Sequence, residues 1–262
     1  MAVIYKRFLA NAIIDEREGR GYKMDGNDKD VLKRMCDEIN ESFPDHPYKY
    51  HYLAEIRMID PPAGVSSILL KYIHQFESES CRAVLVSSIL YDKPRVKGLD
   101  RIIMDLYNHF RASSYYMSTP STAHIYLKYD NAFSKLKSSK ISSELVALMK
   151  YRREVYILPF TAIMIARKWA PKELGEIMSA HLMNRNVTRA DVGMLEDGDY
   201  TPSLEVIVRE TAFTAIECLL YYPSEENLKI IMEYTNHPNK ELAKYAQESA
   251  ERMRTRLDLL KT

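Results

Sequence analysis

The sequence has no large excess of either charge. Its 262 residues include 37 lysines and arginines and 36 aspartates and glutamates, which gives a net charge of +1. A protein that holds nucleic acid through phosphate contacts usually has a basic surplus, because each contact needs a lysine or an arginine. The balance therefore argues against nucleic acid as the main partner, although it leaves room for a local basic face.

Glycine is also scarce, with 8 residues in the whole chain. We find no glycine-rich phosphate loop, no dinucleotide-binding fingerprint and no Gly-x-Ser-x-Gly nucleophile motif. No catalytic residue and no cofactor are therefore predicted. Low glycine content and balanced charge instead favour a soluble, mostly helical protein.

Cysteine is rare and widely spaced, and no Cys-x-x-Cys pair is present. The three cysteines are Cys36, Cys81 and Cys218. Each occupies an apolar position of a predicted helix, which favours buried thiols over a disulfide framework or a cysteine-based zinc site.

Histidine and acidic residues do not form a metal-binding motif. His46 and His51 are the closest histidines in the sequence, and a gap of five residues across Pro47 is not the spacing of paired ligands. The run from Asp25 to Asp30 lacks the glycine that a calcium loop needs at its sixth position. Cys36 also stands where the bidentate glutamate of such a loop belongs. No metal site is predicted.

Long apolar runs are absent. The longest strongly apolar stretch extends from Val155 to Ala166 and is well short of the roughly 20 residues needed to cross a bilayer. Near the N-terminus, Lys6 and Arg7 precede a short apolar run, but Asp15 ends it too early for a secretory signal. A cytoplasmic protein without a membrane partner is predicted.

Helical periodicity is the strongest positive signal. Apolar residues that recur at i, i+4, i+7 and i+11 lie on one side of a helix. The first such stripe consists of Val208, Ala212, Ala215 and Leu219. A similar stripe begins 34 residues later and consists of Leu242, Ala246, Ala250 and Met253. A helix pair that repeats at about this period is typical of a solenoid.

A four-residue word supports the repeat. Phe-Thr-Ala-Ile occurs at 160–163 and again at 213–216. Each copy is followed by a proline that is predicted to start a helix, Pro171 or Pro223, because a proline at the first helical position loses no hydrogen bond. Each of these helices carries an Ile-Met pair, which ends at Met178 or Met232. Word, proline and Ile-Met pair therefore recur in the same order.

Further helix starts are predicted from capping residues and apolar spacing. They lie near Val3, Asp28, Tyr48, Thr119, Ser142, Pro159 and Asn239. The last of these helices is expected to end at about Leu260. The stretch from Asn184 to Tyr200, with two glycines and an acidic run, interrupts the repeat and is predicted to be a loop insertion.

With its paired helices, its first-turn prolines and an arginine near the start of two helices (Arg82 and Arg209), the chain resembles the HEAT and armadillo class, including the short HEAT-like repeats of bacteria. The resemblance extends from about Pro62 to the C-terminus. It implies an all-α, right-handed superhelical array of antiparallel helix pairs with a concave binding face. Residues 1–61 are then an atypical N-terminal helical cap, and residues 62–262 are the array.

Two groups of residues are candidate surfaces for a protein or peptide partner. Tyrosine combines apolar area with a polar tip and is enriched at interfaces. The tyrosine group is Tyr115, Tyr116, Tyr126 and Tyr129. The acidic group lies in the insertion and is Glu196, Asp197 and Asp199. The alternatives are tyrosines packed between helices and a solvated acidic turn.

A third group is a candidate nucleic-acid surface, because arginine and tryptophan together can stack on a base. It consists of Arg152, Arg153, Arg167, Lys168 and Trp169. The alternative is a solvated helix end, where basic residues are favoured by the helix dipole.

Three functions are compatible with this sequence. The first is a non-enzymatic interaction module, an adaptor, regulator or toxin-neutralising immunity protein, whose concave face binds a protein or peptide. The second follows from the similarity of HEAT-like arrays to bacterial alkylpurine DNA glycosylases, although no aspartate of this chain maps onto their catalytic position. The third is a regulator that senses a ligand through the insertion at 184–200. The oligomeric state is not predicted.

Overall fold

The computed structural model describes residues 24–58, 62–90, 95–113, 123–192 and 203–261. Every regular element in these ranges is a helix, so the predicted all-α class is confirmed for them. The chain divides into two compact units. Unit 1 comprises residues 1–116 and 121–132, and unit 2 comprises residues 117–120 and 133–262. The predicted boundary at residue 61 falls within unit 1 and stays a prediction, as do the helix starts near Val3 and Thr119, which lie outside the described residues.

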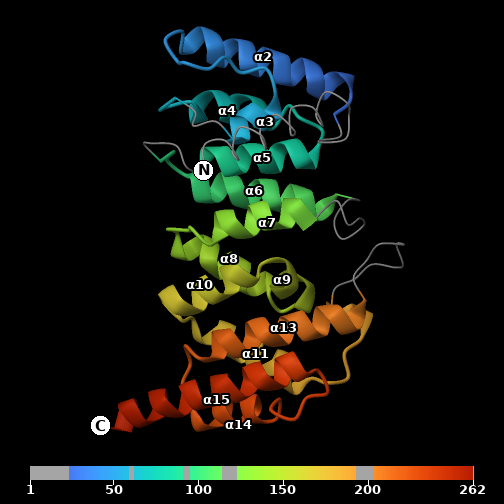
Figure 1. The fold of residues 1–262 in the computed structure, drawn as a ribbon, viewed down its shortest axis with the longest axis vertical. Helices are drawn as coiled ribbons and strands as arrows, with labels where there is room; N and C mark the ends of the chain where they lie inside the picture. The colour runs from blue at the N-terminus through green and yellow to red at the C-terminus, as the bar shows by residue number, and fades with distance from the viewer. Residues whose placement is uncertain (1–23, 59–61, 91–94, 114–122, 193–202, 262) are drawn as a thin grey trace. The chain divides into compact units, whose positions relative to one another are not determined.

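Unit 1 is built from six described helices (Figure 1). They are α2 (Gly26–Ser42), α3 (Leu53–Met58), α4 (Ser66–Ile73), α5 (Glu79–Ile89), α6 (Leu99–Ala112) and α7 (Ala123–Phe133), the last of which ends in unit 2. Helix α2 packs on α4, both α3 and α4 pack on α5, and α5 contacts α6. Helix α5 is therefore the centre of this unit, and its residues from Cys81 to Ile89 are all buried.

The second predicted helix corresponds to α2 and begins slightly earlier than expected. Its residues Val31, Met35 and Ile39 form the predicted buried stripe. The N-cap is Asp25 rather than Asp28, and its carboxylate accepts a hydrogen bond from the Asp28 backbone N–H at 2.8 Å. Asp28 is instead buried, and its carboxylate accepts a hydrogen bond from the backbone N–H of Ser78, the N-cap of α5.

The predicted helix start near Tyr48 is wrong, because α3 begins at Leu53. The backbone N–H and C=O of Tyr50 are both bonded by the side-chain amide of Asn40, at 2.8 Å each. The Glu55 carboxylate accepts the N–H groups of His51 and Tyr52. These side chains satisfy the backbone without a helix, so helical spacing alone mispredicted the segment.

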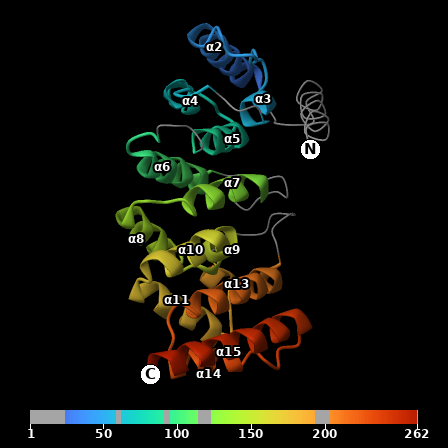
Figure 2. The same ribbon diagram turned by 60° about the vertical axis from the view of Figure 1, so that its left-hand side comes forward.

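Unit 2 contains the remaining helices (Figure 1). They are α8 (Ser139–Leu148), α9 (Arg152–Ile157), α10 (Pro159–Trp169), α11 (Lys172–Met183), α12 (Arg189–Val192), α13 (Leu204–Leu219), α14 (Glu225–Met232) and α15 (Lys240–Lys261). Helix α13 packs on α9, α10 and α11, and α15 packs on α13 and α14. Figure 2 shows α13 between α10 and α15. Helix α11 also packs on α14.

Several helix starts in unit 2 differ from the prediction by a few residues. Pro159 is the first residue of α10, as expected. Ser142 is buried inside α8, whose N-cap is Ser138. Pro223 lies just before Ser224, the N-cap of α14, so the N–H that proline lacks would belong to the segment before the helix and not to the helix itself. For α8 and α14, a serine hydroxyl that accepts a backbone N–H three residues later sets the boundary.

The predicted stripe on α13 is displaced by one residue at its start. Val208 is half-exposed, whereas Ile207 and Thr211 are buried. Helix α13 has neighbours on several sides, and its buried surface is therefore much wider than a single stripe. The aligned methionines also differ in environment, since Met178 is fully buried and Met232 is exposed. Met183, exposed at the end of α11, takes the position that Met232 has at the end of α14.

The last helix, α15, closely matches its prediction. Leu242, Ala246, Ala250 and Met253 are buried against the rest of unit 2. All three cysteines are buried thiols, as predicted. None of the helices that the structure describes combines the length and the apolar character needed to cross a membrane.

Candidate functional site

The tyrosine group lies partly inside the protein. Tyr129 is fully buried, and its ring stacks on Phe110 at a centroid distance of 5.6 Å. Tyr126 is half-buried and contacts the same ring. Burial raises the pKa of Tyr129 well above its ordinary value. Because Tyr129 of α7 packs against Tyr107 and Phe110 of α6, it cannot belong to a binding surface in this conformation. Tyr115 and Tyr116 lie outside the described residues.

The predicted acidic surface, Glu196, Asp197 and Asp199, also lies outside the described residues and stays a prediction. The first part of the insertion is described and contains α12, which sequence analysis did not predict. Thr188 and Asp191 bond reciprocally, with side-chain and backbone contacts of 2.7–3.3 Å. This Thr-x-x-Asp spacing is a capping box, a signal that was present in the sequence.

The basic group divides into two sets with different environments. Arg152 has the largest fully buried side chain of unit 2, with 2% of its surface exposed. Its guanidinium donates to the backbone carbonyl of His181 and, at 2.7 Å, to that of Asn184. These carbonyls end α11, where the helix dipole favours a cation. Burial lowers the pKa of Arg152. Arg152 therefore joins two helices and is not available to nucleic acid, which corrects its assignment to a surface.

His181 completes this buried connection. Its Nε2 lies 2.8 Å from the carbonyl of Met149, so Nε2 carries the proton and donates. Burial lowers the pKa of His181 to about 4, and the nearby charge of Arg152 acts in the same direction. The ring is therefore neutral at pH 7. Together, Arg152 and His181 hold the C-terminal end of α11 against α9 and the end of α8.

Arg153 is also directed into unit 2 and not into solvent. Its Nη2 lies 3.5 Å from the carboxylate of Glu154, which is fully buried. Only 13% of the Arg153 side chain is exposed. Arg153 is therefore not one of the exposed cations of unit 2.

Arg167 and Lys168, by contrast, are exposed at the end of α10. The Lys168 ammonium donates at 2.8 Å to the carbonyl of Leu136, which lies in the turn before α8. It also lies 4.3 Å from the centre of the half-buried Trp169 ring. The Lys168 ammonium therefore covers one face of the Trp169 ring. Less of the ring is left for stacking with a nucleic-acid base.

The bond from Lys168 to Leu136 brings further cations to the end of α10. Lys135 and Lys137 flank Leu136 in sequence, and Lys140 lies in the first turn of α8. We refer to the resulting surface as the basic edge. It consists of Lys135, Lys137, Lys140, Arg167 and Lys168. All of these residues except the half-buried Lys135 are exposed. Sequence analysis missed the three lysines because they precede Arg167 by 27 to 32 positions.

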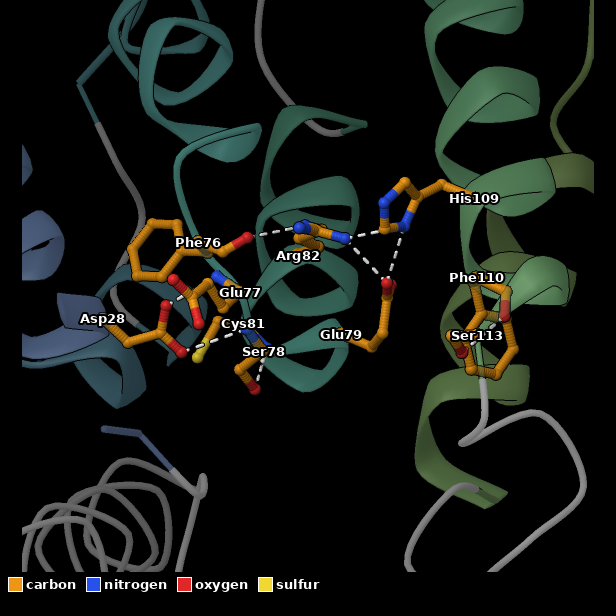
Figure 3. Close-up of polar contacts among 10 residues, drawn as sticks. All are labelled: Asp28, Phe76, Glu77, Ser78, Glu79, Cys81, Arg82, His109, Phe110 and Ser113. Carbon is orange, nitrogen blue, oxygen red and sulfur yellow. Dashed lines mark hydrogen bonds and ion pairs between the residues drawn. The ribbon is translucent and has the colours of Figure 1, made fainter. Parts of the chain in front are cut away.

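Unit 1 contains a polar cluster that sequence analysis did not single out (Figure 3). Glu79 and Arg82, in the first turns of α5, form a buried ion pair with a distance of 2.7 Å. Arg82 also donates from Nε to the carbonyl of Phe76 at 2.8 Å. His109, near the end of α6, places Nδ1 within 2.9 Å of Glu79 Oε1 and 2.8 Å of Arg82 Nη1.

The protonation of His109 decides which of these two contacts is a hydrogen bond. With its proton on Nε2, the ring accepts from Arg82, and with a proton on Nδ1 it donates to Glu79. The second carboxylate oxygen of Glu79 is buried and has no hydrogen-bond partner in the part of the chain that the structure describes. The His109 side chain is 62% exposed. The cluster therefore couples a buried carboxylate to an imidazole that solvent can reach.

The start of α5 is held in place from α2. The buried Asp28 carboxylate accepts the backbone N–H groups of Glu77 at 2.7 Å and of Ser78 at 3.0 Å. Ser78 in turn caps α5 by accepting the N–H of Cys81. Figure 3 shows these contacts on the side of Arg82 opposite His109. Asp28 thus fixes the turn from which Glu79 and Arg82 project.

A carboxylate that orients an imidazole is also found in catalytic sites, where it prepares proton transfer. Such a role needs a reacting group near the ring. The hydroxyl of Ser113 donates to the Phe110 carbonyl at 2.7 Å, away from the imidazole in Figure 3. We assign no catalytic role to this cluster. Among the described residues, no group of three or more histidine, cysteine or acidic side chains is placed to hold a metal ion.

Comparison of the chain with protein-family models, with curated proteins and with solved structures finds no match.

Proposed function

We propose that this protein is a HEAT-like helical-repeat module that binds a protein or peptide partner and catalyses no reaction. In this proposal the helix pairs stack as a right-handed superhelical array, and the partner occupies its concave face. The partner class follows from the balanced charge of the chain and from the absence of a recognised catalytic motif in its sequence.

The observation that supports this proposal best is the packing of unit 2. Helix α13 packs on both members of the pair α10 and α11. Helix α15 repeats this relation, because it packs on both α13 and α14. When each new helix rests on the preceding pair, further pairs can be added without closing the fold, which is how solenoids grow. The Phe-Thr-Ala-Ile words lie on α10 and α13, the equivalent helices of successive pairs.

Side-chain bonds support the same relation between successive pairs. Tyr222, which precedes α14, donates to the carbonyl of Pro171, which precedes α11, at 3.0 Å. Tyr234, which follows α14, donates to the carbonyl of Leu182 at the end of α11 at 2.7 Å. Both ends of α14 are therefore attached to the corresponding ends of α11. A rigid stack of this kind presents a fixed surface to a partner.

Affinity capture from a native lysate, with and without nuclease, tests this function. We expect a protein that is retained in stoichiometric amount after nuclease treatment. Recovery of nucleic acid, or of proteins that disappear when nuclease is added, would contradict the proposal and favour the glycosylase-like alternative. Turnover of alkylated DNA by the purified chain would contradict it directly.

A further inference from the structure

The basic edge consists of cations from two segments that a contact within unit 2 brings together. Its lysines come from the turn before α8 and from the first turn of α8, and Arg167 and Lys168 come from the end of α10. The bond from Lys168 to Leu136 connects these two segments. The fold therefore brings together two cationic segments that lie far apart in sequence.

The start of α8 adds to the positive potential of this edge. Ser138 caps the helix, and its hydroxyl accepts the N–H of Ile141 at 3.3 Å. The remaining N–H groups of the first turn carry the positive end of the helix dipole. Lys137 and Lys140 flank this turn, so dipole and side chains attract an anion together.

Acidic residues limit the basic edge. Glu144 follows Lys140 by one helical turn and is half-exposed. On α11, Glu173 and Glu176 are exposed, and Glu176 pairs with Lys172 at 3.2 Å. Beyond α11, Glu225 and Glu226 start α14, which packs on α11. An anion that fits this edge is thus short, because a longer one would meet these carboxylates.

We propose that the basic edge binds a short acidic segment of the partner protein. This inference rests on the proposed function and names the chemistry of the partner. A peptide with several adjacent glutamates or aspartates matches a local cluster of cations on a chain of nearly zero net charge. A nucleic acid is disfavoured for three reasons: its charge continues past the acidic boundary, four of the five cations are lysines, and Lys168 covers the Trp169 ring.

Binding of a fluorescent octaglutamate peptide to the full chain tests the proposal, with an octaglutamine peptide as the uncharged control. We expect binding that weakens as salt is added, because exposed charges are screened. The triple variant Lys137→Glu, Lys140→Glu and Arg167→Glu should weaken the affinity by about tenfold or more, since three attractions become repulsions. Lys168 is kept, because its bond to Leu136 supports the fold.

The matched control is the triple variant Lys29→Glu, Lys33→Glu and Lys97→Glu. These lysines are exposed on unit 1, and the variant changes the net charge by the same amount. It should bind the peptide like the wild-type chain at physiological salt. Equal weakening in both variants would show a non-specific charge effect and overturn the proposal. So would absence of peptide binding, or tighter binding of a single-stranded or duplex oligonucleotide of equal charge.

The same variants separate this inference from the proposed function. If affinity capture recovers a partner protein that the Lys137, Lys140 and Arg167 variant retains at wild-type level, the partner binds elsewhere and only the inference fails. If no partner protein is recovered, the proposed function fails as well. Circular dichroism and thermal unfolding of both triple variants verify that the fold is intact.

Discussion

In unit 1, the polar side chains that join one helix to another are mainly carboxylates. Asp28 accepts two N–H groups at the start of α5, Glu38 accepts the Lys71 ammonium and the Tyr72 hydroxyl, and Glu79 of α5 lies 2.9 Å from Nδ1 of His109 on α6. These carboxylates accept hydrogen bonds from side chains of other helices and from the backbone N–H groups just before α5, which have no partner within the helix.

In unit 2, the corresponding side chains are mainly donors that bind backbone carbonyls. Tyr222, Tyr234 and Lys168 each donate to a carbonyl of another helix or of the turn beside it. Arg152 and His181 do the same in the interior. Two carboxylates of the described residues depart from this pattern. Glu217 accepts Tyr245 at 2.5 Å and pairs with Arg252 at 3.1 Å, and Glu233 accepts Arg185 at 2.8 Å.

The difference shows two ways to join stacked helices. A buried carboxylate can accept several N–H groups at once, so one residue carries much of a connection. Every helix of a repeat ends in free carbonyl groups, so each repeat can add its own side-chain donor. The stabilisation of the stack is then divided among many residues. Single substitutions should therefore have larger effects in unit 1 than at the tyrosines of unit 2.

Replacement of Asp28 by alanine should have the largest effect. It removes the charged acceptor of two part-buried N–H groups, those of Glu77 and Ser78, which should lower the free energy of unfolding of unit 1 by about 3 kcal/mol. Urea unfolding with hydrogen exchange read by mass spectrometry measures the loss and locates it to α2 and the start of α5.

Asp25→Ala is the control, because it removes only the cap of α2. It should destabilise unit 1 by about 1 kcal/mol, the usual contribution of a helix cap. A loss for Asp28→Ala no larger than this would show that the carboxylate connection is not dominant in unit 1.

His181 predicts an acid-sensitive unit 2. The folded state holds the ring neutral, with a pKa of about 4, whereas the unfolded chain titrates near 6.5. The stabilisation is therefore complete above about pH 6.5 and is lost as the pH falls toward 4, because the unfolded state binds the proton first. The shift corresponds to about 3 kcal/mol. His181→Gln should flatten the stability profile of unit 2 between these pH values.

His74→Gln, at an exposed position of unit 1, is the matched control and should leave the profile of unit 2 unchanged. Urea midpoints measured at several pH values give both profiles. A wild-type profile of unit 2 that is flat between pH 6.5 and 4 would contradict the neutral, buried ring.

Removal of one tyrosine hydroxyl should have the smallest effect. Tyr234→Phe deletes a donor to a buried carbonyl and should lower stability by about 1 kcal/mol. Tyr222→Phe deletes the equivalent bond at the other end of α14, where the side chain is half-buried, and should lower stability by about 0.5 kcal/mol. Thermal and urea unfolding measure both. A loss above that of Asp28→Ala for either variant would invert the comparison between the units.

Local patterns in the sequence predicted the helices well. The apolar spacing of α15 and the proline at the start of α10 required no knowledge of tertiary contacts. The mispredicted starts of α3 and α8 depend on side chains that cap the backbone locally, Glu55 and Ser138, and the capping box of α12 belongs to the same class. Such caps can be read from sequence when they are sought before periodicity.

The candidate sites depend on contacts that no local pattern contains. Arg152 and His181 are separated by 29 positions, Lys168 and Leu136 by 32, and Tyr234 and Leu182 by 52. A basic residue in a helix is usually solvated, so burial of Arg152 becomes visible only when the carbonyls that end α11 are placed beside it. For the same reason the lysines of the basic edge could not be grouped with Arg167 from the sequence.

The burial of the cysteines has a practical consequence for kinetics. Cys36 and Cys81 lie in unit 1 and Cys218 lies in unit 2, each with at most 2% of its surface exposed. A thiol reagent can modify them only when the surrounding helices separate, and burial raises the pKa of Cys218 as a further barrier to reaction. The rate at which each thiol is labelled, measured by mass spectrometry of its peptide, therefore reports how often each unit opens. The measurement needs no substitution in the chain.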